Sequence, residues 1–230
     1  MQTTTENSGR KICPVQFDET DELLDIRYDN IFKAVFTKDT PASKGALSGL
    51  VSALIQRKVI VQTITANEPS SENAFDRQIR FDIACKAITG ELVNIEMTFN
   101  PEYDEMVRLE YYASRQFSGQ NIRGVDKNFA DLAETFPIAI IGNKRFFPDD
   151  ALIHTFQYHD AEHSIPFGGK SRIIMVELLK AERIIDKPIV EMNDSEKWSL
   201  FFQYLIVCEG DISRPLGRLK GYVPRDKYLT

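Results

Sequence analysis

The most regular pattern along the chain is a pair of alternating hydrophobic and polar runs. They lie in the segment DRQIRFDIACKAITGELVNIEMTF, residues 76–99, and are joined by ITGEL. Alternation with a period of two indicates β-strands, and the glycine in the joining segment favours a tight turn. The segment is therefore predicted to be a β-hairpin. Glu96 falls in the middle of its second strand, among residues that are expected to be buried.

Hydrophobic spacing elsewhere predicts helices on either side of further strands. Apolar residues recur at helical spacing in residues 23–39, 44–58, 102–123 and 194–208. Strands are expected at 59–69, at 136–141, and as a second pair at 154–160 and 171–180. Asp29 or Asn30 should cap the first helix, and Asp194 or Ser195 should cap the last.

Helices that flank a mixed set of strands indicate an α/β protein. The 230 residues, of which 43% are hydrophobic and 27% are charged, suffice for one domain with a sizeable core. We expect a frayed lead-in over residues 1–20, the domain itself over 21–210, and an irregular tail over 211–230.

The net charge of −6 argues against a surface coated in basic residues, although it leaves room for a local basic groove. The three cysteines, Cys13, Cys85 and Cys208, are too widely spaced for a disulfide framework or a metal knuckle, so a reducing cytoplasm is expected. The polar N-terminus lacks the apolar core of a signal peptide, and no apolar run is long enough to cross a membrane.

The hairpin carries one acid on each strand, Asp82 and Glu96. Period-two alternation places Asp82 in phase with Lys86, and Glu96 in phase with Thr98. Two neighbouring carboxylates can share a hard divalent cation such as Mg²⁺, with the backbone carbonyl of Met97 as a further ligand. Such an ion activates water and stabilises charge on a phosphate. The other interpretation is that both acids are simply solvated on the outer side of the hairpin.

The helix after the hairpin carries a second polar cluster. Arg108, Tyr112 and Arg115 are separated by four and three residues, so they can line one face of the helix. One interpretation is that they bind a ligand. The other is that Tyr112 and its neighbour Tyr111 are partly core residues, while the arginines pair with acids on the helix such as Glu105 or Glu110.

The stretch HDAEH, His159 to His163, matches the H-x-x-E-H pattern of some zinc peptidases. That chemistry requires both histidines on one helical turn. Here an alternating HTFQY precedes the stretch and SIPFGG follows it, so a hairpin turn is expected in place of a zinc site.

The hairpin and several other motifs resemble one known family. IRFDIACKAITGELVNIEM resembles the core of the PD-(D/E)XK nuclease-like transposases, relatives of the recombination-promoting nucleases, which show R-x-D-I, a glycine turn and N-I-E-M-Q. Further segments resemble later family motifs: DNIFKAVF, RLEYYASRQFSGQ, RIIMVELLK and EKWSLFF. Together these segments cover roughly residues 22–208, and their order and spacing are more specific than any one motif.

This resemblance implies a restriction-endonuclease-like fold, a central mixed sheet flanked by helices with the active site on the hairpin. It implies that Asp82 and Glu96 bind Mg²⁺ or Mn²⁺. Thr98 departs from the pattern, because the superfamily has lysine at that position and this family usually has glutamine. Threonine can position a water through its hydroxyl group but cannot neutralise phosphate charge, so Lys86 or Lys33 is expected to substitute.

The resemblance also implies a function and a partner. The chain is expected to be a metal-dependent DNA endonuclease associated with mobile elements or recombination, with Arg108, Tyr112 and Arg115 holding the DNA backbone. We expect DNA as the partner, no membrane, and allow for a homodimer. The alternative is a catalytically impaired nuclease fold that serves as a DNA- or protein-binding module, which Thr98 and the acidic net charge favour.

Overall fold

The structure is a computed structural model that describes residues 25–65, 82–122 and 128–204. The expected lead-in and tail lie outside these ranges, as does the hairpin sequence before Asp82. Among the described residues, no helix has the length and apolar character that a membrane crossing requires. Cys85 is a buried free thiol.

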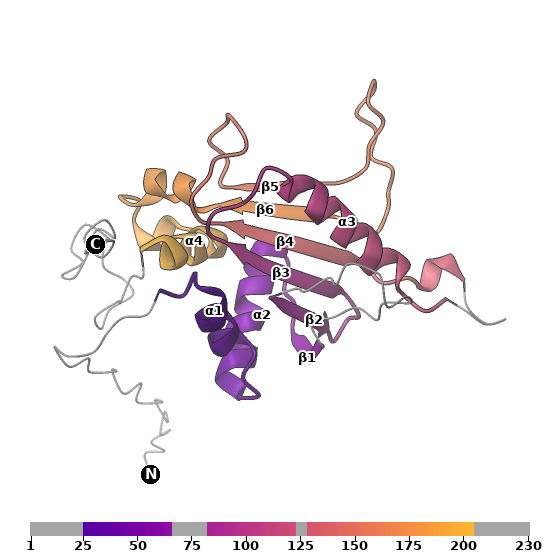
Figure 1. Cartoon of the computed structure of the whole chain (residues 1–230), viewed down its shortest axis with the longest axis horizontal. Coiled ribbons are helices and arrows are strands. Elements are labelled where there is room, and N and C mark those ends of the chain that lie inside the picture. The colour runs from indigo at the N-terminus through magenta and orange to yellow at the C-terminus, as the bar shows by residue number, and fades with distance from the viewer. Residues whose placement is uncertain (1–24, 66–81, 123–127, 205–230) are drawn as a thin grey trace, which may run out of the picture.

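A mixed sheet of six strands forms the centre of the molecule (Figure 1). In spatial order the strands are β1 (Val61–Thr65), β2 (Ile83–Ala87), β3 (Leu92–Thr98), β4 (Thr135–Ile141), β6 (Ile173–Glu177) and β5 (Ile153–Phe156). The three neighbours β3, β4 and β6 are parallel, whereas β1, β2 and β5 run antiparallel to the strands beside them. The predicted strands and the α/β class are confirmed.

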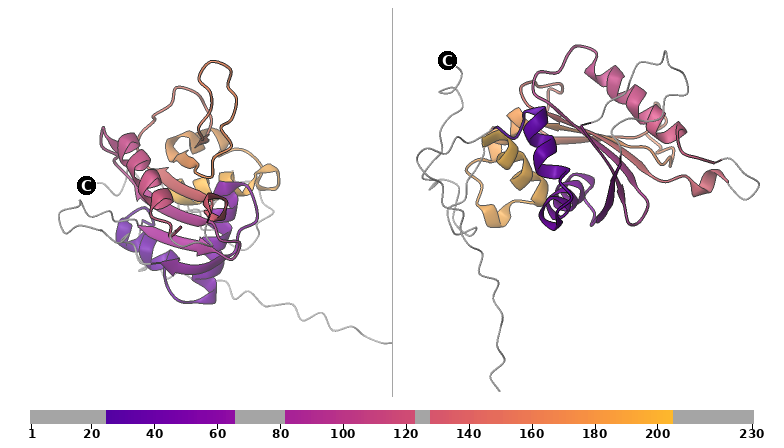
Figure 2. Two further views of the ribbon diagram at one scale, coloured as in Figure 1. Left: turned by 90° about the vertical axis from the view of Figure 1, so that its right-hand side faces the viewer. Right: turned by 60° about the horizontal axis from the view of Figure 1, so that its bottom comes forward.

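Helices cover both faces of the sheet. The helices are α1 (Asp29–Phe36), α2 (Pro41–Ile55), α3 (Glu105–Ser118) and α4 (Asp194–Tyr204), with three short 3₁₀ segments, Phe129–Asp131, Leu178–Ile184 and Ile189–Glu191. Helices α1, α2 and α4 gather on one face, and α3 lies on the other (Figure 2). The flanked sheet expected for a restriction-endonuclease-like core is thus confirmed.

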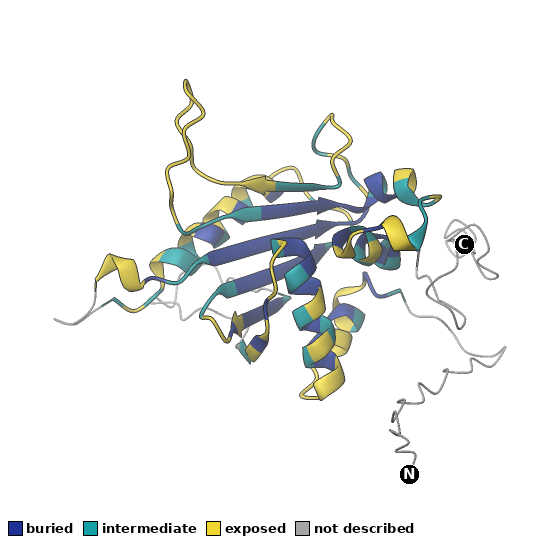
Figure 3. Ribbon diagram, turned by 180° about the vertical axis from the view of Figure 1, so that it is seen from behind, coloured by how far each residue is buried: buried dark blue, intermediate teal, exposed yellow. Residues whose placement is uncertain are grey.

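Two hydrophobic cores lie on opposite faces of the sheet. On the larger side, the rings of Phe32, Phe36, Trp198 and Phe202 contact one another at centroid distances between 5.0 and 6.2 Å. The smaller core lies under α3 and is made of Leu109, Ala139, Ile141 and Met175. Alternate residues of a strand point to opposite faces. Because a core covers each face, β4 is buried along its whole length (Figure 3).

The helix caps differ from the sequence prediction. Tyr28 precedes α1 without a side-chain cap, and Asp29 is the first helical residue. Asn193 caps α4, because its side chain accepts the N–H of Glu196 at 2.9 Å and the Glu196 carboxylate accepts the N–H of Asn193 at 2.9 Å. The carboxylate of Asp29 is instead directed at Lys33, which matters for the site described below.

The hairpin of β2 and β3 has the predicted glycine turn. Gly90 adopts φ +104°, a conformation that favours glycine, and the Gly90 N–H bonds the carbonyl of Ala87 at 3.0 Å. Cα pairing runs from Lys86 with Leu92 to Ile83 with Ile95. The stretch His159 to His163 forms the predicted turn, in which the Ser164 N–H bonds the carbonyl of Asp160 at 3.0 Å.

Candidate active site

The two acids of the hairpin lie opposite each other at its open end. Ile83 pairs with Ile95, so the next step of the antiparallel register sets Asp82 against Glu96. Their side chains share the face of the sheet that α3 covers, since Ala84, in phase with Asp82, packs against Tyr112 of α3. The hairpin thus brings both predicted acids to one face beneath one helix.

Asp82 is held by the backbone of β3 and by a lysine from α1. Its Oδ2 accepts the N–H of Met97 at 2.8 Å, and its Oδ1 lies 3.3 Å from the Nζ of Lys33. The same Nζ lies 2.5 Å from Oδ1 of Asp29. Because the N–H and C=O of one strand residue point to the same side, the Met97 carbonyl also faces the Asp82 side of β3.

Glu96 is buried and is paired with an arginine from α3. It is 5% exposed, which rules out the solvated interpretation, and its Oε2 lies 3.1 Å from Nη2 of Arg108. The same nitrogen lies 2.7 Å from Oε1 of Glu105, an acid that is 2% exposed. The Arg108 guanidinium also lies 5.6 Å from the ring centre of Tyr112. Arg108 therefore connects α3 to the hairpin, and its pairing with Glu105 was one of the two interpretations for this helix.

Both acids of the pair hold their protons unusually tightly. Burial raises the pKa of Asp82 to about 6, and the Asp29 carboxyl group adds to the rise, while the Met97 N–H and Lys33 oppose it. Burial likewise raises the pKa of Glu96 to about 7, with Asp82 and Glu105 adding to the rise and Arg108 opposing it. Removing two neighbouring carboxylates from water is costly, which is the physical cause of both shifts.

The two cations beside the pair also have raised pKa values, but here the neighbouring carboxylates cause the rise and burial opposes it. Burial alone would lower the pKa of Lys33, but Asp29 and Asp82 outweigh it and raise that pKa. Burial would also lower the pKa of Arg108, yet the Glu105 and Glu96 carboxylates raise it. Both side chains therefore stay protonated at neutral pH, so a positive charge stands on each side of the pair.

The donor set suits a hard divalent cation. Four carboxylates (Asp29, Asp82, Glu96 and Glu105) surround two cations, a formal excess of two negative charges. Among the described residues, no three Asp, Glu, His or Cys side chains converge as a metal-binding group. The fit therefore rests on two carboxylates and a carbonyl, the kind of partial set that Mg²⁺ completes with water.

The other predicted residues lie at different distances from this pair. Thr98 is half-buried at the end of β3 and shares the face of Glu96. Lys86 is exposed and pairs with Leu92, about 13 Å along the hairpin from Asp82 at the usual strand rise. Arg115 is half-buried on α3, about 10 Å along the helix from Arg108. The fold therefore brings Lys33 to the pair and leaves Lys86 away from it.

Asp29 is a site residue that the sequence prediction did not include. The sequence pattern suggests Asp29 only as a helix cap, although Asp29 stands four residues before Lys33 on α1. Residues four apart lie on the same side of a helix, so this spacing was the available signal. What the sequence did not reveal is that α1 packs where Asp29 and Lys33 reach the hairpin.

The raised pKa of Glu96 predicts that the metal-free protein loses stability as the pH rises. Between about pH 4.5 and pH 7 the folded state keeps a proton that the unfolded state has lost, so folding stability falls through this window and levels off above it. The expected loss is on the order of 3 kcal/mol. Urea unfolding of wild type and Glu96→Gln in a chelator at pH 5 and pH 8 measures it.

Glutamine cannot titrate, so the part of the loss that comes from Glu96 should disappear in Glu96→Gln, while the raised pKa of Asp82 still contributes its own part. Mg²⁺ should reduce the loss in wild type, because an ion bound only to the folded state opposes it. An equal pH dependence in the two proteins would contradict the prediction.

A second buried ionic cluster lies at the same end of the sheet, where the parallel strands β3, β4 and β6 finish. Glu177, at the end of β6, and Lys180 both have fully buried side chains, and Nζ lies 2.5 Å from Oε2. The same Nζ lies 3.1 Å from Oδ1 of Asp149, whose Oδ2 lies 2.9 Å from Nε2 of His154. Glu177 Oε1 also accepts the N–H of Phe146 at 2.6 Å. The lysine occupies the space between the acids, so this cluster fastens the loop after β4 to β6.

Comparison with known proteins identifies the family. The family model described as PD-(D/E)XK nuclease family transposase matches residues 26–206, which include every described helix and strand. Comparisons with curated proteins and with solved structures gave no significant match. The matched region contains the hairpin with its acid pair, the α1 lysine and the α3 arginine. The chain therefore belongs to the PD-(D/E)XK nuclease family of transposases.

Proposed function

We propose that this protein is a Mg²⁺- or Mn²⁺-dependent DNA endonuclease that acts in recombination or on mobile elements. The family membership supports a nuclease-like function. The observation that carries the proposal is the pair of half-buried Asp82 and buried Glu96, which shares one sheet face and, with Asp29 and Glu105, sets four carboxylates around two cations. Such a pair is costly unless a cation completes it.

Each residue of the site takes a separate role in this proposal. Asp82, Glu96 and the Met97 carbonyl would hold the ion, which when bound makes a nucleophilic water available at neutral pH and offsets phosphate charge. Lys33 keeps Asp82 ionised and oriented through its 3.3 Å contact. The Thr98 hydroxyl group positions the attacking water, and Lys33 supplies the positive charge that a lysine at position 98 would carry.

The face of α3 that carries Arg108, Tyr112 and Arg115 is proposed to hold the DNA backbone. Arg108 shares its guanidinium between Glu96 and Glu105 in the absence of metal. Once Glu96 is neutralised, Arg108 can turn part of its hydrogen-bonding capacity to a phosphate. Tyr112 packs below it and would keep the guanidinium on the sheet side of the helix.

Restoring a cation at position 98 should raise the rate of cleavage. Thr98 is half-buried on the face of Glu96, so the longer side chain of Thr98→Lys has a path to the solvent side of the acid pair. One added charge close to a phosphate is worth about tenfold in rate. Plasmid nicking by Thr98→Lys, with Thr98→Val as the control that removes the hydroxyl group, measures both effects. A rate in Thr98→Lys no higher than in wild type would contradict this role of position 98.

Thr98 also favours a second candidate function, a nuclease fold without turnover that binds DNA or protein. That protein would bind DNA with a salt-dependent affinity but would not cut it under any metal condition. The cytoplasm is proposed as its location in either case, supported by a cysteine pattern that suits reducing conditions. A homodimer stays a prediction.

The deciding experiment is conversion of supercoiled plasmid to nicked plasmid by the full chain. We expect nicking with Mg²⁺ or Mn²⁺ and none with a chelator. No nicking under any metal condition, together with salt-dependent DNA binding, would favour the binding module over the enzyme.

A further inference from the structure

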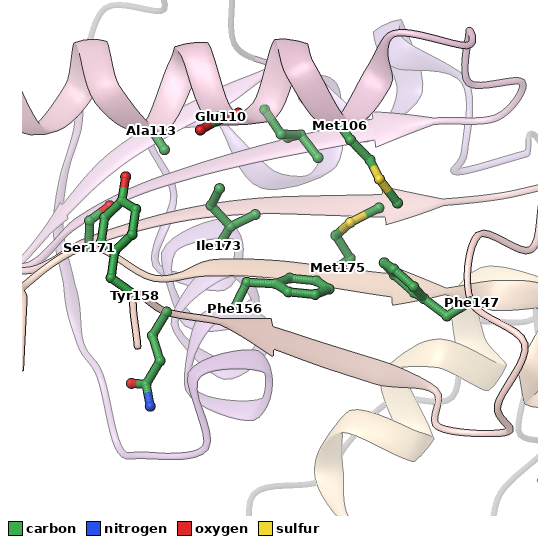
Figure 4. Close-up of a pocket in the computed structure, with 11 residues that line it drawn as sticks. Met106, Glu110, Ala113, Phe147, Phe156, Tyr158, Ser171, Ile173 and Met175 are labelled. Carbon is green, nitrogen blue, oxygen red and sulfur yellow. The ribbon is translucent and has the colours of Figure 1, made fainter. Parts of the chain in front are cut away.

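An apolar cavity of about 260 Å³ lies between α3 and the half of the sheet formed by β5 and β6 (Figure 4). Its floor is formed by Ile173 and Met175 of β6, and the rings of Phe147 and Phe156 stand beside them, with their centroids 5.3 Å apart. Met106 and other residues of α3 form the roof. Phe156 is 41% exposed, so the aromatic wall can be reached from solvent.

The cavity lies close to the acid pair. Glu96 pairs with Ala139, and Ala139 pairs with Met175 in the floor of the cavity, so these residues form one row across the sheet. Two strand spacings place Glu96 and Met175 about 10 Å apart. One flank of α3 presents Arg108 to Glu96, and the neighbouring flank presents Met106 and Glu110 to the cavity. A strand of DNA that crosses the start of α3 would therefore contact both places.

The chemistry of the lining selects the kind of group that fits. Among the described residues that line the cavity there is no lysine, arginine or histidine, and Glu110 is the one charged residue, so a phosphate or carboxylate would be repelled. The aromatic faces and the thioethers favour a flat π system. Tyr158 and Ser171 add hydroxyl groups at one end (Figure 4), and Gln157 is a further polar lining residue. Glu110 can accept from an exocyclic amine, as carboxylates do from cytosine.

We propose that this cavity binds a nucleobase of an unpaired DNA strand, so that the preferred substrate is single-stranded, branched or locally opened DNA. The inference rests on the proposed endonuclease function, because it places the phosphate of the same strand at the acid pair. A stacked strand advances about 3.4 Å per nucleotide, so the bound base would lie about three nucleotides from the scissile phosphate. A base inside a duplex is stacked and cannot enter.

The test is DNA binding in a chelator, where no cleavage occurs. Fluorescence anisotropy would compare a labelled single strand, the matching duplex and an abasic strand with the same backbone. Wild type should bind the normal strand more tightly than the abasic strand. Phe156→Ala should weaken single-strand binding about tenfold, because one base–aromatic stack is lost, and duplex binding should stay within about twofold. Phe167→Ala is the matched control, since this ring lies between β5 and β6, is 78% exposed and does not line the cavity.

Ser171→Phe is a second variant that fills the cavity without deleting an apolar contact, so a folding defect in Phe156→Ala would leave the test intact. It should also lose the preference for the normal strand over the abasic strand. Equal binding of normal and abasic strands by wild type would overturn the base-binding inference. If the same protein nicks plasmid, the proposed function stands without it. Absence of all DNA binding would overturn both.

Discussion

Asp82→Asn is expected to abolish metal-dependent plasmid nicking, lowering the rate by about a thousandfold or more. Asp82 and Glu96 face each other across the hairpin, so the loss of Asp82 leaves Glu96 as the sole acid of the pair. Metal-ion stabilisation of the transition state is worth several kcal/mol, and each 1.36 kcal/mol corresponds to tenfold in rate. The measurement is the initial rate of nicking at saturating Mg²⁺ and again at saturating Mn²⁺.

Asparagine is chosen because its carbonyl oxygen can still accept the Met97 N–H that Asp82 accepts at 2.8 Å. The β3 backbone should therefore be retained, and the melting temperature without metal should not fall. Asp186→Asn is the matched control, an exposed aspartate that lies between the 3₁₀ segments Leu178–Ile184 and Ile189–Glu191. Nicking by Asp82→Asn at the rate of Asp186→Asn would contradict the role of the acid pair.

Lys180→Met should destabilise the protein by about 3–5 kcal/mol, since it leaves a buried carboxylate without its partner. The Lys180 and Glu177 side chains are both fully buried, and the ammonium group lies 2.5 Å from the acid. Methionine has a similar shape, so the loss reports charge and not volume. For a domain of this size the melting temperature should fall by roughly 10 °C. Urea unfolding at neutral pH measures the free energy.

Two further variants separate the buried charge from a general effect of losing a lysine. Lys197→Met removes a lysine that is 45% exposed and paired with Asp194, so it should change stability by less than about 1 kcal/mol. Lys180→Met combined with Glu177→Gln removes both charges and should recover part of the loss. Equal effects of Lys180→Met and Lys197→Met would contradict the idea that this cluster holds the loop after β4 to β6.

Local patterns were enough to predict most of the fold. The hairpin follows from alternation and a glycine turn, and all four helices and the second strand pair appear where spacing predicted them. The helix caps were misplaced by one or two residues, because several residues that can cap stand next to one another at each start. In α1 the decision depended on Asp29 pairing with Lys33 and the hairpin, which no local pattern encodes.

Some features of the candidate site could likewise be predicted from the sequence, and others could not. Asp82 and Glu96 could be placed on one face from sequence, because the period of a strand and the position of one turn determine which side chains share a face. The sequence could not decide which lysine lies beside the acids. Lys86 follows Asp82 by four residues but lies farther along the hairpin, whereas Lys33, which contacts Asp82, is on a helix some fifty residues earlier in the chain. Arg108 was found as part of a helix face, but its shared contact with Glu96 and Glu105 depended on how α3 crosses the sheet.

The sequence by itself determined the strands, the helices, the acid pair and the resemblance to a nuclease family, because these depend on residues close together in the chain. The tertiary structure alone decided that Glu96 is buried and Asp82 half-buried, which cations stand beside them, and that an apolar cavity lies across α3 from them. Burial, charge pairing and cavities are properties of residues brought together from distant segments. Those properties set the pKa of Asp82 and Glu96, the shifts that the proposed cation would offset.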